Sequence, residues 1–211
     1  MSAVSIDAGR LIQRLEILAL TESAPGVWTW QRAAGVKGQV EPSKTRNLFS
    51  SVGIGARGVE IIIRRRAITL HNAMVWTDFL TGRRQPLFLT DIAPQGRLHL
   101  KLQAAVVTPV TCTAERTSAS VGSGGRPVTA ENAKLTFPGV LTEKYARYER
   151  EETHAENDTS YVLVTPKPVE LKAGDLVTVG DGPAKAVYNV TVCHVLDEWK
   201  NEYEIAWRKD V

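Results

Sequence analysis

The sequence predicts an all-β protein built from two small antiparallel β-barrel or β-sandwich domains with little helix. Apolar residues alternate with polar ones in many short runs, which is the pattern of half-buried strands, and small or polar turn residues separate the runs. In addition, residues 59–103 and 160–207 read as two copies of one pattern, roughly a hundred residues apart, a period too long for a solenoid. The similarity of these two segments favours a duplicated domain, although any two antiparallel meanders share alternation and short turns.

The two copies can be compared strand by strand. The expected matches, in chain order, are Ile61 and Ile63 with Val162 and Val164; Ile68, Leu70, Val75 and Thr77 with Val169, Leu171, Leu176 and Thr178; Phe88, Thr90 and Ile92 with Tyr188, Val190 and Val192; and Leu98, Leu100 and Leu102 with Tyr203, Ile205 and Trp207. The register between the copies changes only in turns, where insertions are tolerated. Trp76 and Trp207 are therefore expected in or near a core.

The first unit is expected to open with a short turn and a strand. Residues 11–20 fit either a helix or a strand, and Gly9 together with the β-rich surroundings favours the strand. Residues 27–31 carry two Trp on one side and predict the next strand, which continues through residues 36–40. Residues 41–58 then form a long loop with no sustained period, and such a loop inside a compact β-domain is usually functional or disordered.

Composition predicts the domain boundaries. The first domain is expected at residues 1–113, a flexible linker rich in Ser, Thr and Gly at 114–132, and a second, smaller β-domain at 133–211. The second domain opens with a strand at 134–139, and the charged stretch 141–158 fits either a helix or an edge strand followed by a loop.

The net charge of +3, from 26 basic and 23 acidic residues, is mild for a protein whose main task is to grip nucleic acid. No apolar run approaches the length that spans a bilayer, and the N-terminus lacks the layout of a signal peptide, so we expect no membrane contact and folding in the cytoplasm. Cys112 and Cys193 have no CxxC spacing, and we expect buried small hydrophobic residues rather than a disulfide or a zinc site.

The sequence contains no nucleophile elbow, HExxH motif or phosphate-binding glycine loop, so we expect neither an enzyme nor a cofactor. Cys193 and His194 are adjacent on a strand and point to opposite faces, so no metal site is expected there. Acidic pairs such as Glu202 and Glu204 could supply the two carboxylates of a glycosidase, but surface charge on solvated turns explains them better.

The densest basic features are Arg64-Arg65-Arg66 after an apolar strand and Arg83-Arg84 in a turn. Because side chains alternate along a strand, Arg64 and Arg66 should share one face and Arg65 the other. Such a pair could bind phosphates or an acidic partner, since the guanidinium fork matches both geometries. It could equally keep an edge strand soluble.

The first half of the chain shows an ordered series of features. It runs from the opening GRLIQRLEIL through the Trp-bearing strand VWTWQRAAGVKGQVEP and the long loop to the strand VEIIIRRR, and it ends in the meander AITLHNAMVWTDFLTGRRQPLFLTDIAPQGRLHLKL. In this order it resembles the small β-barrel head-tail joining, or head-closure, proteins of long-tailed bacteriophages. Members of that family are commonly a single short barrel, so the second unit is not covered by the resemblance.

The resemblance implies a structural, non-enzymatic protein of the virion neck that is assembled in the host cytoplasm into a homo-oligomeric ring. Its partners would be the portal or adaptor protein on one side and the tail terminator or tail tube protein on the other. The long loop would act as a stopper in the channel and help to retain packaged double-stranded DNA; its alternative is a plain surface segment. The gate residues would be Leu48, Phe49, Val52, Gly53, Ile54 and Gly55. Contacts with DNA phosphates or a partner would come from Lys44, Arg46, Arg57, Arg64 and Arg66.

Two other functions fit the same sequence. A tail-completion or minor tail protein would use the same β-units but bind the tail tube. A β-sandwich ligand-binding module, which belongs to a different class, would hold a sugar or a peptide with Trp199 and nearby carboxylates.

Overall fold

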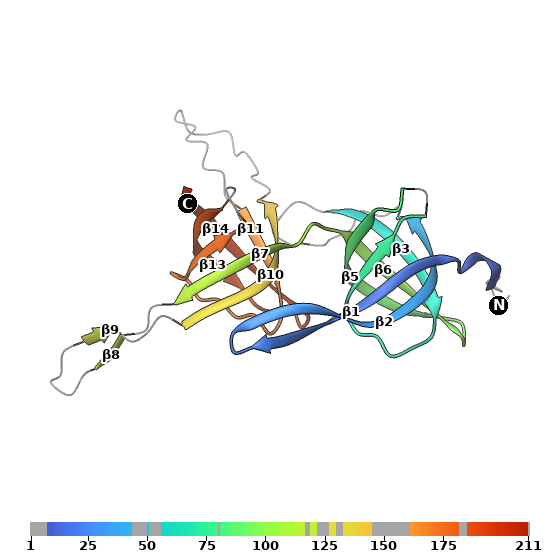
Figure 1. The fold of residues 1–211 in the computed structure, drawn as a ribbon, viewed down its shortest axis with the longest axis horizontal. Helices are drawn as coiled ribbons and strands as arrows, with labels where there is room; N and C mark the ends of the chain where they lie inside the picture. The colour runs from blue at the N-terminus through green and yellow to red at the C-terminus, as the bar shows by residue number, and fades with distance from the viewer. Residues whose placement is uncertain are drawn as a thin grey trace, which may run out of the picture. The chain divides into compact units, whose positions relative to one another are not determined.

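The computed structural model describes residues 8–43, 50, 56–79, 81–116, 119–121, 127–129, 133–144, 161–181 and 185–210. Apart from one 3-10 turn at Ala8–Arg10, the elements in these residues are β-strands (Figure 1), so the prediction of an all-β protein is confirmed. No helix in the described part of the chain has the length and apolar character that crossing a membrane requires.

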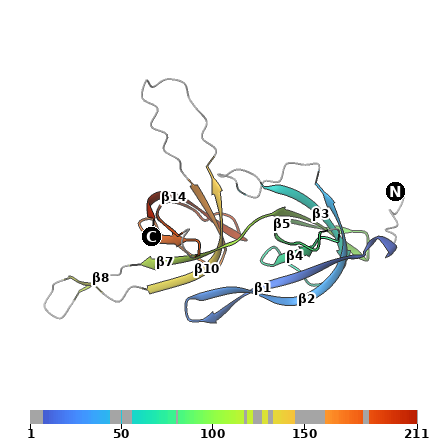
Figure 2. The same ribbon diagram turned by 45° about the horizontal axis from the view of Figure 1, so that its top comes forward.

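The first barrel contains six strands: β1 (Gln13–Ala24), β2 (Val27–Pro42), β3 (Arg57–Arg64), β4 (Ala73–Thr77), β5 (Arg84–Gln95) and β6 (His99–Val106). They are hydrogen-bonded in the order β1-β4-β5-β6-β3-β2, and β2 pairs back to β1 (Figure 2). The sheet therefore closes on itself. The expected turn and strand at residues 11–20 is confirmed, and the two strands expected at 27–31 and 36–40 are one continuous strand.

The second barrel also contains six strands: β7 (Val110–Arg116), β10 (Ala133–Glu143), β11 (Tyr161–Pro166), β12 (Leu176–Val179), β13 (Ala186–His194) and β14 (Lys200–Asp210). Their order is β7-β12-β13-β14-β11-β10, and β10 pairs back to β7. The short strands β8 (Ala119–Val121) and β9 (Pro127–Thr129) form a separate hairpin.

The two barrels have the same connectivity. If β1, β2 and β3 correspond to β7, β10 and β11, and β4, β5 and β6 to β12, β13 and β14, one strand order becomes the other. Even a local irregularity recurs: β5 has a bulge between Leu89 and Asp91, and β13 has one between Val190 and Val192. A bulge is a specific feature of a strand and not a necessity of closure. The shared order and the shared bulge support duplication of one domain.

The recurring bulge fixes which residues are equivalent, and it corrects the matches expected from the sequence. Leu89 pairs with Ala104 and Val190 with Ile205, so Leu87 rather than Phe88 corresponds to Tyr188. Tracing the pairs onward makes Ile61 equivalent to Leu163, and Leu102 to Tyr203. The expected match of Ile61 with Val162 was therefore wrong by one residue, which moves a side chain to the other face of the sheet.

The error at Trp207 has a different cause, because Trp207 lies on the same face of β14 as Tyr203 and Ile205, whereas β11 pairs with β14 only as far as Ile205. This side chain was expected in or near the core, but it is 55% exposed on β14. Trp76, by contrast, packs against the core of the first barrel as expected. The register of β11 cannot be read from the sequence. Val162, Leu163 and Val164 are all buried, so alternation does not mark the inner face of this strand.

The boundary between the two compact units differs from the expected one. The first unit comprises residues 1–21 and 30–109, and the second comprises 22–29 and 110–211. The linker expected at 114–132 lies inside the second unit, where the end of β7 and the β8–β9 hairpin lead into β10. Its Ser, Thr and Gly belong to a connection between paired strands, which composition alone does not distinguish from a link between domains.

The tip of the β1–β2 hairpin, Glu22–Thr29, belongs to the second unit, because its backbone is hydrogen-bonded to residues of that unit. The N–H of Thr136 donates to the carbonyl of Gly26 at 2.7 Å, and Val27 pairs with Thr136 in parallel. Trp28 packs against the core of the second barrel. Gly26 has φ +74°, a conformation that favours glycine, and a Cβ there would meet the Lys134 carbonyl oxygen at 2.7 Å.

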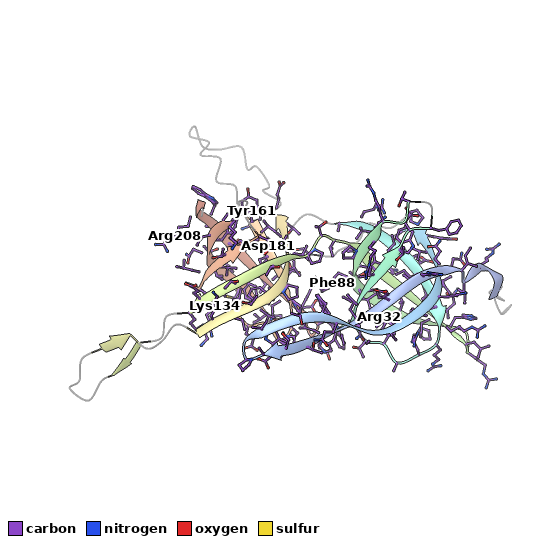
Figure 3. All side chains as sticks on the ribbon, viewed as in Figure 1. Arg32, Phe88, Lys134, Tyr161, Asp181 and Arg208 are labelled. Carbon is purple, nitrogen blue, oxygen red and sulfur yellow. The ribbon has the colours of Figure 1, made fainter. Side chains whose placement is uncertain are left out.

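Apolar side chains fill the interior of each barrel (Figure 3). A glycine in each permits a close approach of strands: a Cβ on Gly38 would lie 2.7 Å from Leu15 Cδ1 and 2.8 Å from the Ile62 carbonyl oxygen. A Cβ on Gly139 would lie 2.8 Å from Leu163 Cδ1 and 2.9 Å from Cys112 Sγ. Gly38 and Gly139 occupy equivalent places on β2 and β10, so in both barrels a glycine at this position permits the close approach.

We predict that Gly38→Ala lowers the free energy of unfolding by about 1–3 kcal/mol, because the added methyl meets backbone as well as side chains. Gly139→Ala should cost less, since it meets only side chains, which can shift. Gly35→Ala is the control, because its nearest neighbour is the end of the Arg32 side chain at 3.0 Å. Urea denaturation measures all three. Equal effects of Gly38→Ala and Gly35→Ala would contradict the close approach.

Candidate functional site

Most of the predicted site residues lie outside the part of the chain that the structure describes. This applies to the gate residues Leu48, Phe49, Val52, Gly53, Ile54 and Gly55 and to the basic residues Lys44 and Arg46. The gate therefore stays a prediction.

The three described residues of the predicted set do not form one site. Arg57 and Arg64 are the first and last residues of β3 and lie at opposite ends of that strand. Arg57 donates from Nη2 to Gln85 Oε1 at 3.0 Å, at the end of the barrel where β5 begins. Arg64 and Arg66 lie together at the other end of β3.

Arg64 and Arg66 line a depression of about 600 Å³ in the first unit. We call it the basic depression, and its lining residues are Leu11, Ile12, Val36, Lys37, Arg64, Arg65 and Arg66. Arg65 was expected on the opposite face from Arg64 and Arg66. The structure removes the basis of that expectation, because β3 ends at Arg64 and strand alternation does not extend to the two residues that follow.

Backbone contacts hold the arginine segment in place. The N–H of Arg65 donates to the carbonyl of Leu98 at 2.8 Å, and Arg66 Nη1 donates to the carbonyl of Gly35 at 3.3 Å. Lys37 comes from β2, two residues beyond Gly35. No sequence pattern marks Lys37, because only the pairing of β2 with β3 brings it beside the arginines.

The basic depression concentrates positive charge. Four of its seven lining residues are Lys or Arg, and none is Asp or Glu. Some other cations of the first unit are paired with carboxylates: Arg84 lies 2.5 Å from Glu16, and Lys101 lies 2.8 Å from Glu60. Within the described residues, no carboxylate forms an ion pair with the Lys or Arg side chains of the depression. Although the net charge of the chain is mild, positive charge is therefore concentrated at the basic depression.

The chemistry of the basic depression is that of anion binding. Guanidinium groups donate two parallel hydrogen bonds to a phosphate or carboxylate, and such charge-assisted bonds are stronger than neutral ones. Ile12, 64% exposed, adds an apolar wall. The lining contains no His, Cys, Ser or carboxylate that could act as a nucleophile or a general base. The arrangement can hold an anion.

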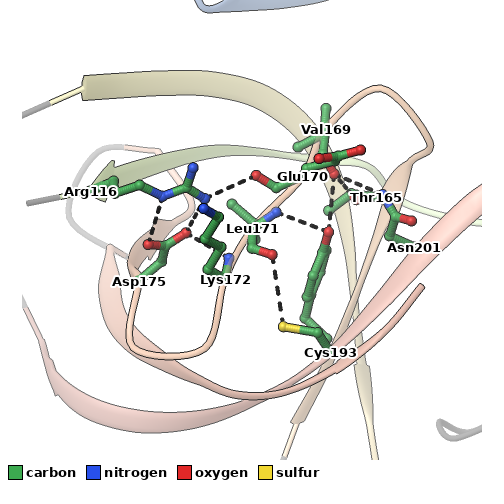
Figure 4. A network of polar contacts seen from close by, with 10 residues as sticks. Arg116, Thr165, Val169, Glu170, Leu171, Lys172, Asp175, Cys193 and Asn201 are labelled. Carbon is green, nitrogen blue, oxygen red and sulfur yellow. Dashed lines mark hydrogen bonds and ion pairs between the residues drawn. The ribbon is translucent and has the colours of Figure 1, made fainter. Parts of the chain in front are cut away.

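The second barrel has a polar cluster of a different kind, formed by the side chains of Arg116, Thr165, Asp175, Asn201 and Tyr203 (Figure 4). Tyr203 donates from its hydroxyl to the Val169 carbonyl at 3.1 Å and accepts from the Leu171 N–H at 3.0 Å. Asn201 and Thr165 donate to the same Val169 carbonyl at 2.9 and 3.3 Å. The cluster ties the segment before β12 to the end of the barrel.

Arg116 and Asp175 complete this polar cluster. Arg116 donates to the two carboxylate oxygens of Asp175 at 3.1 and 2.7 Å, and the Lys172 N–H donates to Asp175 at 2.8 Å. Burial raises the pKa of Asp175, but the bonds from Arg116 and Lys172 outweigh it and hold the pKa below its ordinary value. These polar groups bond to one another and to the backbone, so we assign them a structural role.

The carboxylates of Glu202 and Glu204 also have partners. They were expected on solvated turns, but both lie on β14. Glu202 is buried and lies 2.8 Å from Lys200, and Glu204 contacts Lys144 at 2.5 Å and His194 at 3.0 Å. Burial raises the pKa of Glu204, while Lys144 and His194 lower it to below its ordinary value overall. Both carboxylates therefore have cationic partners within the second barrel.

Neither thiol forms a disulfide. Cys112 is fully buried in the core of the second barrel, as expected of a small hydrophobic residue, and burial raises its pKa to about 12. Among the described residues, no group of three or more His, Cys, Asp and Glu is placed to hold a metal ion.

Comparison of the chain with protein-family models, with curated proteins and with solved structures finds no match.

We predict that Asp175→Ala lowers the free energy of unfolding at neutral pH by about 1.5–3 kcal/mol, the range for hydrogen bonds to a charged partner. Because the folded pKa of Asp175 lies below 3.8, its stabilisation is present above pH 3.8 and is lost as the pH falls through the folded pKa. The gap between the wild type and Asp175→Ala should therefore narrow in acid.

Denaturation of both proteins at several pH values measures this gap. Asp181→Ala removes an exposed carboxylate of the same unit and is the matched control. A gap that stays constant down to strongly acid pH would show that the Asp175 charge does not stabilise the fold.

Proposed function

We propose that the chain is a structural protein of the neck of a tailed-bacteriophage virion. In this proposal it forms a homo-oligomeric ring that joins the portal or adaptor protein to the tail terminator or tail tube protein and helps to retain packaged DNA. Support comes from the resemblance of the first half to head-closure proteins and from the all-β architecture. The observation that carries the proposal is the basic depression.

The basic depression suits weak contact with the DNA backbone. Lys and Arg side chains without carboxylates among them attract phosphates through charge, and this attraction requires no reading of bases. Aromatic residues on which bases could stack are absent from its lining. The depression therefore fits a duplex that passes the protein, and it does not fit recognition of a sequence or of a single strand.

A ring makes such weak contacts sufficient. Several copies around one axis present the same depression to one DNA molecule, so the contacts act together. Closed barrels suit this role because they leave no unpaired strand edge that would draw neighbours into open-ended sheets. Ring contacts must then come from side chains and loops, and Phe79, Leu98 and Leu196 are large apolar side chains exposed by 81, 72 and 100%.

The loop between β2 and β3 keeps its predicted place in this proposal. It would act as the gate, with Arg57 at its end and the basic depression at the far end of β3. DNA retention would then have two parts, an apolar gate and a basic contact.

We predict that the double variant Arg64→Glu/Arg65→Glu binds double-stranded DNA at least about tenfold more weakly than the wild type at low salt. The slope of log affinity against log salt should also fall by about two, since each phosphate contact contributes about 0.9. Fluorescence anisotropy with a labelled duplex measures both quantities.

The matched control is Arg83→Glu/Arg208→Glu, which makes the same change of charge at two exposed arginines outside the basic depression. The control should keep most of the affinity and the slope. If both double variants lose affinity equally, binding depends on overall charge and not on the depression. If the wild type does not bind DNA, the DNA contact is wrong.

A further inference from the structure

One end of the first barrel has a second pocket, separate from the basic depression. It measures about 600 Å³ and lies where β1 and β5 begin and where β2 and β4 end. Val40 and Val59 of the barrel core form its apolar part. The other lining residues are Gln13, Glu41, Pro42, Arg57, Trp76, Asp78, Phe79 and Gln85.

The register of the sheet places two polar side chains of this mouth side by side. Leu15 pairs with Trp76 across β1 and β4, and Leu15 belongs to the core. Gln13 lies two residues before Leu15 and therefore on the same face, as a diagonal neighbour of Trp76. Both side chains turn toward the barrel interior.

Among the residues that the structure describes, each of these two side chains has a buried polar atom that lacks a hydrogen-bond partner. These atoms are Gln13 Oε1, an acceptor, and Trp76 Nε1, whose N–H is a donor. The Gln13 amide is oriented by its Nε2, which donates to the Val40 carbonyl at 3.4 Å, so Oε1 is the atom left over. A buried polar atom without a partner costs about 1–3 kcal/mol.

The charged groups of the mouth have partners of their own. Arg57 is bonded to Gln85 at 3.0 Å, Glu41 accepts from Gln39 at 2.6 Å, and Asp78 accepts from Thr81 at 2.7 Å. Among the described lining residues, the groups that still require a partner are therefore the Trp76 indole N–H, which requires an acceptor, and the Gln13 carbonyl, which requires a donor.

The second barrel shows that the fold does not require this polar pair. Cys112 pairs with Val179 as Leu15 pairs with Trp76, so Val179 is equivalent to Trp76 and Val110 is equivalent to Gln13. Val110 and Val179 are apolar and belong to the packing of the second core. The same barrel end can therefore be closed without polar groups, and the first barrel keeps an energetic cost that the second avoids.

We propose that the mouth of the first barrel is a binding site for an amide group of another molecule, held between Gln13 and Trp76. An amide carries an acceptor and a donor in one plane, so its carbonyl accepts from the indole N–H and its N–H donates to the Gln13 carbonyl. The apolar neighbours of the amide pack on Val40, Val59 and the exposed ring of Phe79. The amide comes from a peptide backbone or from an Asn or Gln side chain of a partner protein.

The test uses the full-length chain and nuclear magnetic resonance of the five Trp indole N–H groups. N-methylacetamide represents the peptide backbone and acetamide the side-chain amide, and each is added in turn. We expect a saturable downfield shift of the Trp76 indole signal, identified from the Trp76→Phe spectrum, and small changes of the other four. The probe with the higher affinity identifies the source of the amide.

Gln13→Val introduces the residue that the second barrel has at this place. It should fold, unfold at the same or a higher urea concentration than the wild type, and bind the amide about tenfold more weakly, the factor for about 1.4 kcal/mol. Gln95→Leu is the matched control, because Gln95 Oε1 is also buried without a partner but does not line the pocket. It should leave amide binding unchanged.

Two results would overturn the site. One is an unsaturable or uniform shift of all the indole signals. The other is a Trp76 indole signal that moves on Gln13→Val before any amide is added and then responds to neither probe, which would show that Gln13 and Trp76 bond to each other. Neither result depends on DNA binding, so the outcome is independent of the proposed function.

Discussion

Closure of each barrel is the constraint on which the rest of the structure depends. The pairing of β1 with β2, and of β7 with β10, gives every strand of a barrel two neighbours, so backbone donors and acceptors are paired around the full circle. Closure also divides the side chains into an inner and an outer face. The inner face must pack, which leaves the strand ends and the outer face for other tasks.

The two barrels satisfy this constraint with different residues at their ends. Where the first barrel pairs Ile63 with Leu100, the second pairs Thr165 with Asn201, and the Thr165 hydroxyl and the Asn201 Nδ2 both donate to the Val169 carbonyl. At the other end, the first barrel has polar Gln13 and Trp76 where the second has two valines. The two barrels thus share a strand order and differ in the residues at their ends.

The sequence predicted the fold class and most strands because period-two alternation reports directly on a half-buried sheet. It could not assign the register of β11, since Val162, Leu163 and Val164 are all buried, nor the unit boundary, since a connection between strands looks like a linker. At the candidate site, Arg64 and Arg66 were identified from charge alone. Lys37 was not identified, because only the pairing of β2 with β3 brings it beside Arg64 and Arg66. The gate residues lie outside the described part of the chain, so they remain a prediction.

The most direct test of the proposed function is an image of the particles made from the genome that encodes this chain, at a resolution that traces protein strands. We expect a closed ring of copies at the neck, with Lys37, Arg64, Arg65 and Arg66 facing the DNA in the channel. A chain located along the tail would instead favour a tail-completion protein. A ring at the neck whose basic depression faces away from the channel would contradict the DNA contact, and a particle without the chain would contradict the whole proposal.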